Sequence, residues 1–286
     1  MNPLTQRQIE FNARSRDGWD VFGLHRDKVT ALLRTVPVVA KLRLCVLGAG
    51  NCNDLDLATL LHTFQEIHLV DLDAEALTHG VARQGLENNP AVRTHGGLDV
   101  TGVFDELAGW SPQTVLRDED LRACMERPVR MLAATLSGPF DVVASTCLLS
   151  QLVLSVVRTV GEAHPRFLEA IQAIRAGHLR LLANLVAPGG TGVLITDVVS
   201  SDTFPPLGSV PDASLPQVLA KLIADHNFFH GVNPAVLARF FRTDPVVAPQ
   251  VTALEMVPPW LWDLGPRVYA VCALTFRIRG DPPSKT

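Results

Sequence analysis

Residues 45–57 read CVLGAGNCNDLDL, and this stretch decides the fold. Its first residues are apolar, as in a buried strand, and they lead into Gly48, Ala49 and Gly50. Glycine adopts backbone angles that other residues avoid, so the chain can turn sharply here and approach a bound ligand closely. A strand, a glycine turn and a helix together form a common nucleotide-binding unit. Two glycines alone are weak evidence and are also compatible with a plain tight turn, so the rest of the chain has to decide.

The residues behind the glycine turn predict a helix. Their apolar positions recur at intervals of three and four residues: Leu57, Leu60, Leu61 and Phe64. We expect Asn53 to cap this helix. Asp54 and Asp56 would then lie in its first turn, where acidic side chains suit the positive end of the helix dipole.

Apolar strand-like runs alternate with helical patterns along the chain. The runs are 42–47, 66–71, 91–96, 140–145 and 191–199. Helices are predicted over 73–85, capped by Asp73, and over 165–186, ending at the Pro-Gly-Gly of 187–190. Short apolar runs separated by helices indicate parallel strands that are covered on both faces.

The tail predicts two further strands, 251–257 and 267–278. The segment between them is too short for a crossover helix, so the two strands should pair antiparallel. Trp260 and Trp262 would lie in the turn of this hairpin. The predicted fold class is therefore α/β: a doubly wound, mostly parallel seven-stranded sheet with an antiparallel last strand.

Two regions add to this minimal sheet. Residues 1–40 are predicted to form an N-terminal helical cap, and residues 41–286 a Rossmann-like domain with an insertion at 102–138. The apolar residues of the cap, including Phe11, Trp19 and Phe22, are too many for a free tail. We expect the cap to gate the site where a substrate would bind.

The composition excludes several function classes. The chain has 286 residues with 47% hydrophobic and 19% charged, and a net charge of −4, with no basic stripe for nucleic acid. No apolar run is long enough to cross a membrane, and the first residues do not resemble a signal peptide. The five cysteines are unpaired in pattern, which favours reduced thiols, no metal site and a cytoplasmic protein.

Polar residues follow three of the predicted strands at the same edge of the sheet. Asp71 ends the second strand, where an acid can accept hydrogen bonds from ribose hydroxyls. Asp99 follows the third strand, where an acid can accept from an adenine amino group, although a solvated turn aspartate is an equal reading. Ser145 and Thr146 end the fourth strand and would form the floor of a pocket.

The ordered series VLGAGNCND, HLVDLDAEAL, GLDVTG, FDVVASTCLL and LVAPGGTGVLITDVV resembles the motifs of Rossmann-like (class I) S-adenosylmethionine-dependent methyltransferases. The resemblance covers about residues 40–200, and the order and spacing of the motifs carry it rather than any single one. It implies a methyltransferase with S-adenosylmethionine as cofactor.

The resemblance also implies a place for each cofactor-binding residue. The loop beneath the methionine part of the cofactor would be Gly48, Ala49, Gly50 and Asn51. Asp71 and Leu72 would lie at the ribose, and Asp99 and Val100 at the adenine. Ser145 and Thr146 would lie beside the reactive methyl group. The chain departs from the family at Val46, where an acid is common, and at Cys52, where a third glycine is common. A side chain at Cys52 would narrow the loop.

Alternative readings of the loop remain. A nicotinamide (NAD(P)) oxidoreductase would need a third glycine at Asn53, and Tyr269 is the only tyrosine for a Tyr-Lys type of dehydrogenase. A non-catalytic S-adenosylmethionine-binding protein and an aminopropyl transferase are further alternatives; the acid-rich motif of the latter is not apparent.

The acceptor is predicted to be a small molecule. The chain has neither the Asn-Pro-Pro-aromatic motif of nucleobase and glutamine amino methylation nor the Pro-Cys of cytosine C5 enzymes. Weak candidates for a catalytic base are His226, His230 and His164, whereas His178 is expected to be a core histidine. The acceptor atom and the oligomeric state do not follow from the sequence.

Overall fold

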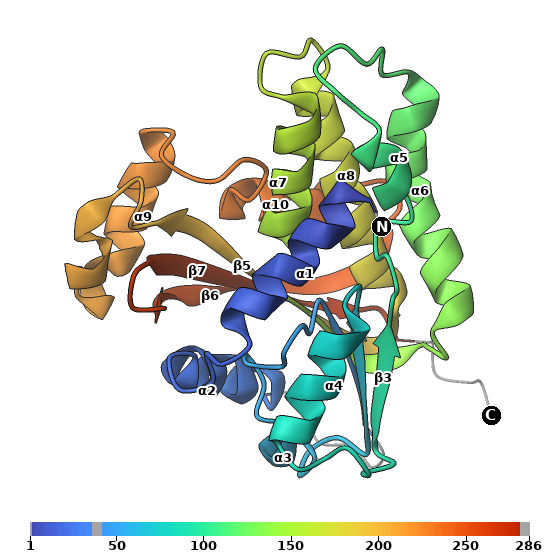
Figure 1. Ribbon diagram of the computed structural model, residues 1–286, viewed down its shortest axis with the longest axis vertical. Coiled ribbons are helices and arrows are strands. Elements are labelled where there is room, and N and C mark those ends of the chain that lie inside the picture. The colour runs from blue at the N-terminus through green and yellow to red at the C-terminus, as the bar shows by residue number, and fades with distance from the viewer. Residues whose placement is uncertain (1, 36–41, 281–286) are drawn as a thin grey trace.

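The computed structural model describes residues 2–35 and 42–280, so the predicted boundary between cap and main domain lies outside the described residues. The described strands form one sheet in the order β3-β2-β1-β4-β5-β7-β6 (Figure 1). Their bounds are β1 Arg43–Leu47, β2 Glu66–Asp71, β3 Val92–Gly96, β4 Phe140–Thr146, β5 Val186–Ser200, β6 Val251–Asp263 and β7 Val268–Ile278. The first five strands are parallel and β7 is antiparallel to both neighbours, which confirms the predicted fold class.

Helices cover both faces of the sheet (Figure 1). Their bounds are α1 Pro3–Ser15, α2 Gly23–Leu33, α3 Leu57–Leu60, α4 Ala74–Arg83, α5 Phe104–Ala108, α6 Asp118–Thr135, α7 Leu149–Val160, α8 Phe167–Asn184, α9 Leu215–Ala224 and α10 Pro234–Thr243, with short 3₁₀ turns at Pro205–Ser209, Asp212–Ser214 and Ala248–Gln250. Helices α2, α3 and α4 pack on one face, and α6, α7, α8 and α10 pack on the other. The insertion 102–138 therefore contributes α5 and α6.

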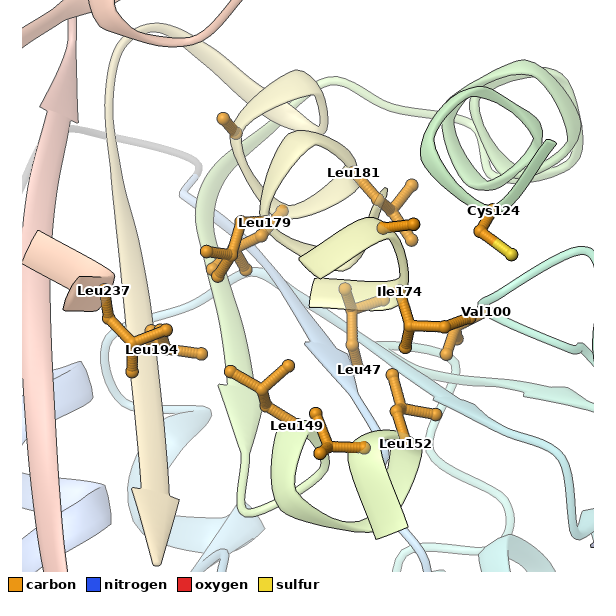
Figure 2. Close-up of a cluster of buried hydrophobic side chains, with 14 of the residues drawn as sticks. Leu47, Val100, Cys124, Leu149, Leu152, Ile174, Leu179, Leu181, Leu194 and Leu237 are labelled. Atoms are coloured by element: carbon orange, nitrogen blue, oxygen red, sulfur yellow. The ribbon is translucent and has the colours of Figure 1, made fainter. Parts of the chain in front are cut away.

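The buried strands alternate their side chains between the two helical layers. In β1, Cys45 and Leu47 face the layer of α7 and α8, while Leu44 and Val46 face the layer of α2 to α4. Figure 2 shows the first of these cores, where Leu47 lies near Leu149 of α7 and Ile174 of α8. The apolar face predicted for the helix at 165–186 is buried in this core, as expected.

The segment after the glycine loop differs from the prediction. Helix α3 spans only four residues, and Asp56 caps it by accepting from the amide of Thr59 at 2.9 Å. Asn53 is not the cap, because its side-chain amide donates to the carbonyl of Ser15 in α1 at 2.6 Å. Propensity places a cap at either residue, and the contact with α1 decides between them. The predicted cap of α4 is confirmed: Asp73 accepts from the amide of Ala76 at 3.0 Å.

The tail hairpin is longer than predicted. Trp260 and Trp262 lie within β6 rather than in a turn, and they pack against His25 of α2 at centroid distances of 5.9 and 4.4 Å. Strand β5 likewise begins at Val186, so the predicted Pro-Gly-Gly stop belongs to the strand and α8 ends just before it. In both places pairing with a neighbouring strand extends an element through residues that favour turns.

The glycine loop rests on α4 at a glycine. A Cβ added to Gly80 would lie 2.3 Å from the carbonyl oxygen of Asn51 and 3.0 Å from the Cβ of Cys52. These contacts are closer than van der Waals distance, and the first is with backbone, which cannot rotate away. The absence of a side chain at Gly80 therefore sets the height of the loop above the helix.

We expect Gly80→Ala to lower the free energy of unfolding by about 1–3 kcal/mol, because the overpacking outweighs the better helix propensity of alanine. Chemical denaturation monitored by circular dichroism measures the change. Gly109→Ala is the matched control: Gly109 is exposed, its φ is −84° and the nearest atom to an added Cβ is 3.4 Å away, so the change should stay within about 0.5 kcal/mol. Equal effects of the two substitutions would contradict the packing argument.

Candidate functional site

Two adjoining cavities lie where β1, β2, β4 and β5 end. The larger has a volume of about 530 Å³ and the smaller about 50 Å³. Asn12 of α1, Gly48 of the glycine loop and Gln151 of α7 line both. This edge of the sheet is the usual position for ligands in open α/β sheets, because loops from both layers meet there.

The cofactor residues implied by the sequence divide between these two cavities. The larger is lined by Gly48, Ala49, Gly50, Asn51 and Thr146, and the smaller by Gly48, Asp71, Leu72, Asp99 and Val100. Ser145 lines neither cavity, since its hydroxyl is buried against Nε2 of His178 at 2.8 Å. The residues assigned to the methionine part and those assigned to the nucleoside thus form two separate groups around one shared glycine.

Asp71 holds the glycine loop in place. Its Oδ2 accepts from the amide of Gly50 at 2.8 Å, and its Oδ1 accepts from the amide of Asp73 at 2.9 Å and from Nδ2 of Asn12 at 3.4 Å. Burial raises the pKa of this carboxyl above its ordinary value, and the two backbone donors oppose that shift. Three donors thus already face this carboxylate, which also lines the smaller cavity.

Asp99 forms local hydrogen bonds with both of its oxygens. Oδ1 accepts from the amide and the hydroxyl of Thr101 at 2.8 and 2.7 Å, and Oδ2 accepts from the amide of Phe104 at 2.9 Å. The carboxylate thus shapes the turn that leads into α5. It still lines the smaller cavity, beside Val100.

The two asparagines of the opening stretch hold α1 against the loop. Nδ2 of Asn51 donates to the carbonyl of Asn12 at 2.6 Å, and Asn53 donates to Ser15 as described above. Their Oδ1 atoms are buried without a partner. Cys52 has a φ of 53° and points into the core rather than into either cavity, so it does not narrow the loop. Figure 1 shows α1, in blue, between α4 and α7.

Only one of the candidate histidines lines a cavity. His230 lines the larger cavity, and its Nε2 lies 3.2 Å from Oε1 of Glu162. His164 is buried, with Nε2 at 2.9 Å from the carbonyl of Thr114 and Nδ1 accepting from an amide, so it is a structural residue. His226 is exposed and lines neither cavity. His178 is a core histidine, as predicted, and burial lowers its pKa to about 4.

Sequence reasoning missed two carboxyl groups of the larger cavity. Asp54 follows the glycine loop, and burial together with the charge of Asp197 raises its pKa to about 7. Asp197 lies in β5, is 8% exposed and accepts from the hydroxyl of Ser150 at 2.5 Å; burial raises its pKa to about 6. The signal for Asp197 was available, because a single acid interrupts the apolar run TGVLITDVV.

A buried histidine stands behind Asp54. Nδ1 of His25 accepts from the indole nitrogen of Trp260 at 3.1 Å, so the ring proton is on Nε2. That nitrogen lies 3.7 Å from Oδ1 of Asp54, and neither atom has a hydrogen-bond partner. Burial lowers the pKa of His25 to about 3, so the ring is neutral and provides no cation to Asp54.

Comparison with known proteins gives a likeness of fold. No family model matches the chain, and no curated protein does. Among solved structures, an O-methyltransferase family protein from Burkholderia thailandensis has a TM-score of 0.47 and 16% identity over 96% of this chain and 60% of that one. The chain thus spans less than two thirds of that protein.

Two further solved structures are similar at the same level. The N-methyltransferase NodS from Bradyrhizobium japonicum WM9 has a TM-score of 0.41 and 11% identity, over 91% of this chain and 97% of that one. Human N-acetylserotonin methyltransferase in complex with SAM has a TM-score of 0.42 and 12% identity, over 97% and 57%. These likenesses are too distant to assign an activity or an acceptor.

The described residues also bear on the requirements of membrane spans, metal sites and disulfides. Within 2–35 and 42–280 no helix is long and apolar enough to cross a membrane, and no group of three His, Cys, Asp or Glu side chains could hold a metal ion. All five cysteines are buried and unbonded. Burial raises the pKa of the Cys147 thiol, which lies on the wall of the larger cavity.

The raised pKa of Asp54 predicts a pH-dependent stability. The folded protein keeps a proton on Asp54 up to about pH 7, whereas the unfolded chain releases it near the ordinary aspartate pKa of 3.8. The stability that this proton contributes is present in acid and is lost as the pH rises through about 7. At about pH 8, Asp54→Asn should therefore raise the free energy of unfolding by about 2–4 kcal/mol, and near pH 4 by little.

Denaturant titration at the two pH values measures this difference. The control is Asp225→Asn at the exposed C-terminal end of α9, which should change the free energy of unfolding by less than about 0.5 kcal/mol at both pH values. A gain for Asp54→Asn that is the same near pH 4 and near pH 8 would rule out a buried charge as its cause.

Proposed function

We propose that the chain binds S-adenosylmethionine across the two adjoining cavities and transfers its methyl group to a small-molecule acceptor in the larger one. The observation that carries this proposal is the division of the sequence-predicted residues: the nucleoside set lines one cavity and the methionine set lines the other. A nucleoside joined to an amino-acid chain through one sulfur matches two cavities that share a glycine.

The walls of the site fit this group. Gly48 has a φ of 77°, and a Cβ there would lie 2.8 Å from the Cβ of Leu148, so only glycine fits at this position, which lines both cavities. Thr146 and Asn51 each have a buried side-chain oxygen without a partner at the larger cavity. When bound, S-adenosylmethionine supplies an electrophilic methyl group on a sulfonium. The chain itself contributes orientation, exclusion of water and an acceptor for a proton.

A dinucleotide suits this site less well. Rossmann dinucleotide sites place the pyrophosphate at the N-terminus of the helix that follows the glycine loop. Here α3 has four residues and starts at Leu57, beyond Asn51 and Asn53, whose side chains bind α1. The loop therefore offers no helix N-terminus to a pyrophosphate, which argues against the nicotinamide alternative.

Helix α1 would have to yield when the cofactor binds. Asn12 lines both cavities, and its Oδ1 would lie 2.8 Å from a Cβ on Gly50. Its Nδ2 also occupies the Asp71 carboxylate that the resemblance assigns to ribose. We therefore extend the proposal to the cap: α1 covers the cofactor site and moves or re-pairs Asn12 on binding.

Calorimetry tests the cofactor assignment. Titration with S-adenosylmethionine, its demethylated product S-adenosylhomocysteine and the nicotinamide dinucleotides should show binding of the first two only. Mass spectrometry of ligands that co-purify with the protein provides an independent readout. Binding of a dinucleotide alone would overturn the proposal. Binding without transfer to any acceptor would favour the non-catalytic alternative.

Asp71→Ala should weaken S-adenosylmethionine binding by about 2–4 kcal/mol, or roughly 30- to 1,000-fold, because it removes charge-assisted hydrogen bonds to the ribose. It also leaves the amides of Gly50 and Asp73 without an acceptor, so circular dichroism must show that the variant is folded. Asn12→Ala is the matched control: it removes a competitor for the same carboxylate and should leave the affinity unchanged or higher. Weaker binding in Asn12→Ala than in Asp71→Ala would contradict this assignment.

A further inference from the structure

A row of aromatic side chains lines the larger cavity. The ring centroids of Phe22 and Trp262 are 5.0 Å apart, those of Trp262 and Tyr269 are 5.4 Å apart, and those of Tyr269 and Phe229 are 6.3 Å apart. These residues come from the start of α2, from β6, from β7 and from the loop after α9, and all four line the cavity. Aromatic faces attract cations as well as apolar groups.

The same cavity contains two carboxyl groups that form no ion pair with a charged side chain within residues 2–35 and 42–280. Asp54 has a buried Oδ1 without a partner, and the nearby imidazole of His25 is neutral. Asp197 accepts only from the hydroxyl of Ser150 among side chains. Arg26 lowers the pKa of Asp54 through its charge, but it lines neither cavity.

The basic side chains of this cavity already have acidic partners. Arg267 lies 2.5 Å from a carboxylate oxygen of Asp202 and donates to the hydroxyl of Tyr269 at 3.0 Å. His230 lies 3.2 Å from Glu162. An anionic acceptor would therefore find no free positive charge in this cavity, whereas a cation would find two acids.

Of the two acids, Asp197 is the one whose strand connects to the aromatic row. The amide of Phe229 donates to the carbonyl of Val198, the residue after Asp197, at 2.8 Å, and the charge of Asp197 contributes to the raised pKa of Tyr269. Asp54, by contrast, follows directly on the loop that we assign to the methionine part. Asp197 and the aromatic row thus line the same cavity, and strand pairing and a backbone hydrogen bond connect the segments that carry them.

We propose that the acceptor is an apolar amine, held with its ammonium group against Asp197 and its apolar body along the row Phe229, Tyr269 and Trp262. This inference rests on the proposed function for the chemistry that follows binding, and on the cavity alone for the binding itself. The aromatic row alone would accept any apolar molecule. The unpaired acid restricts the proposed substrate class to apolar amines.

The chemistry balances with this residue as base. An ammonium has no lone pair, so it must first lose a proton, which the Asp197 carboxylate accepts. The nitrogen lone pair then forms the new N–C bond, the S–C bond of the donor breaks, and the electron pair stays on sulfur. Burial raises the pKa of Asp197 to about 6, which makes it a stronger base than a solvated aspartate.

The test uses three probes of one shape and different charge: 3-phenylpropylamine, 3-phenylpropan-1-ol and 3-phenylpropionate. Their affinities are measured by calorimetry near neutral pH, with and without S-adenosylhomocysteine, which occupies any site for the methionine ammonium. We expect the amine to bind about tenfold or more tightly than the alcohol, and the carboxylate to bind most weakly. Equal affinity of amine and alcohol would overturn the proposal, and this comparison needs no variant.

Variants locate the charge. Asp197→Asn should abolish the preference for the amine over the alcohol while leaving the affinity for the alcohol within about threefold. Asp225→Asn, outside both cavities, should keep the preference. Amine preference that persists in Asp197→Asn would also overturn the proposal.

The outcome separates this inference from the proposed function. Amine preference without any binding of S-adenosylmethionine or its product would leave the amine site standing and refute the methyl donor. Binding of S-adenosylmethionine with no preference for the amine would leave the methyl donor standing and refute the amine site.

Discussion

The carboxylate of Asp71 is the contact on which the site depends. It accepts from the amide of Gly50 at 2.8 Å and from that of Asp73 at 2.9 Å, so it joins the end of β2 to the glycine loop after β1 and to the start of α4. Gly80 of α4 then supports the same loop from below. A single buried acid thereby fixes the edge at which the two cavities meet, and an unpaired backbone amide there would cost about 1–3 kcal/mol.

The N-terminal helix α1 is an integral part of the site, because it is hydrogen-bonded to the glycine loop. Asn51 and Asn53 cap the carbonyl groups at the end of α1, and Asn12 reaches back to Asp71. Asn51 and Asn53 of the opening stretch therefore bind a helix whose residues lie 39 and 38 positions earlier in the sequence. Helix α1 thereby contributes part of the wall of both cavities, with Asn12 lining each of them.

The acidic and basic side chains of the larger cavity differ in whether they have partners. Each basic residue on its wall has an acidic partner, as Arg267 has Asp202, whereas Asp54 and Asp197 are buried without a positively charged partner among the described residues. Burial raises the pKa of both acids into the range in which they exchange protons near neutrality. A site of this kind favours a cationic ligand and can also remove its proton, and these two properties together support an amine acceptor.

The sequence by itself determined the parallel strands and most of the residues at the edge where the two cavities lie. Alternating apolar runs predict parallel strands that are covered on both faces, and Gly48, Asp71 and Asp99 lie at the edge where the ends of such strands meet. The order β3-β2-β1-β4-β5-β7-β6 comes from the tertiary structure, because strand pairing is a long-range contact. Partners remote in sequence decided the rest. Asn53 donates a hydrogen bond to Ser15 of α1 instead of capping a helix, and the hydroxyl of Ser145 is hydrogen-bonded to His178. Asp54 and Asp197 line the same cavity, where the charge of Asp197 contributes to the raised pKa of Asp54. Only tertiary structure decides such contacts, because a polar side chain takes whichever buried partner the packed elements bring within hydrogen-bond distance.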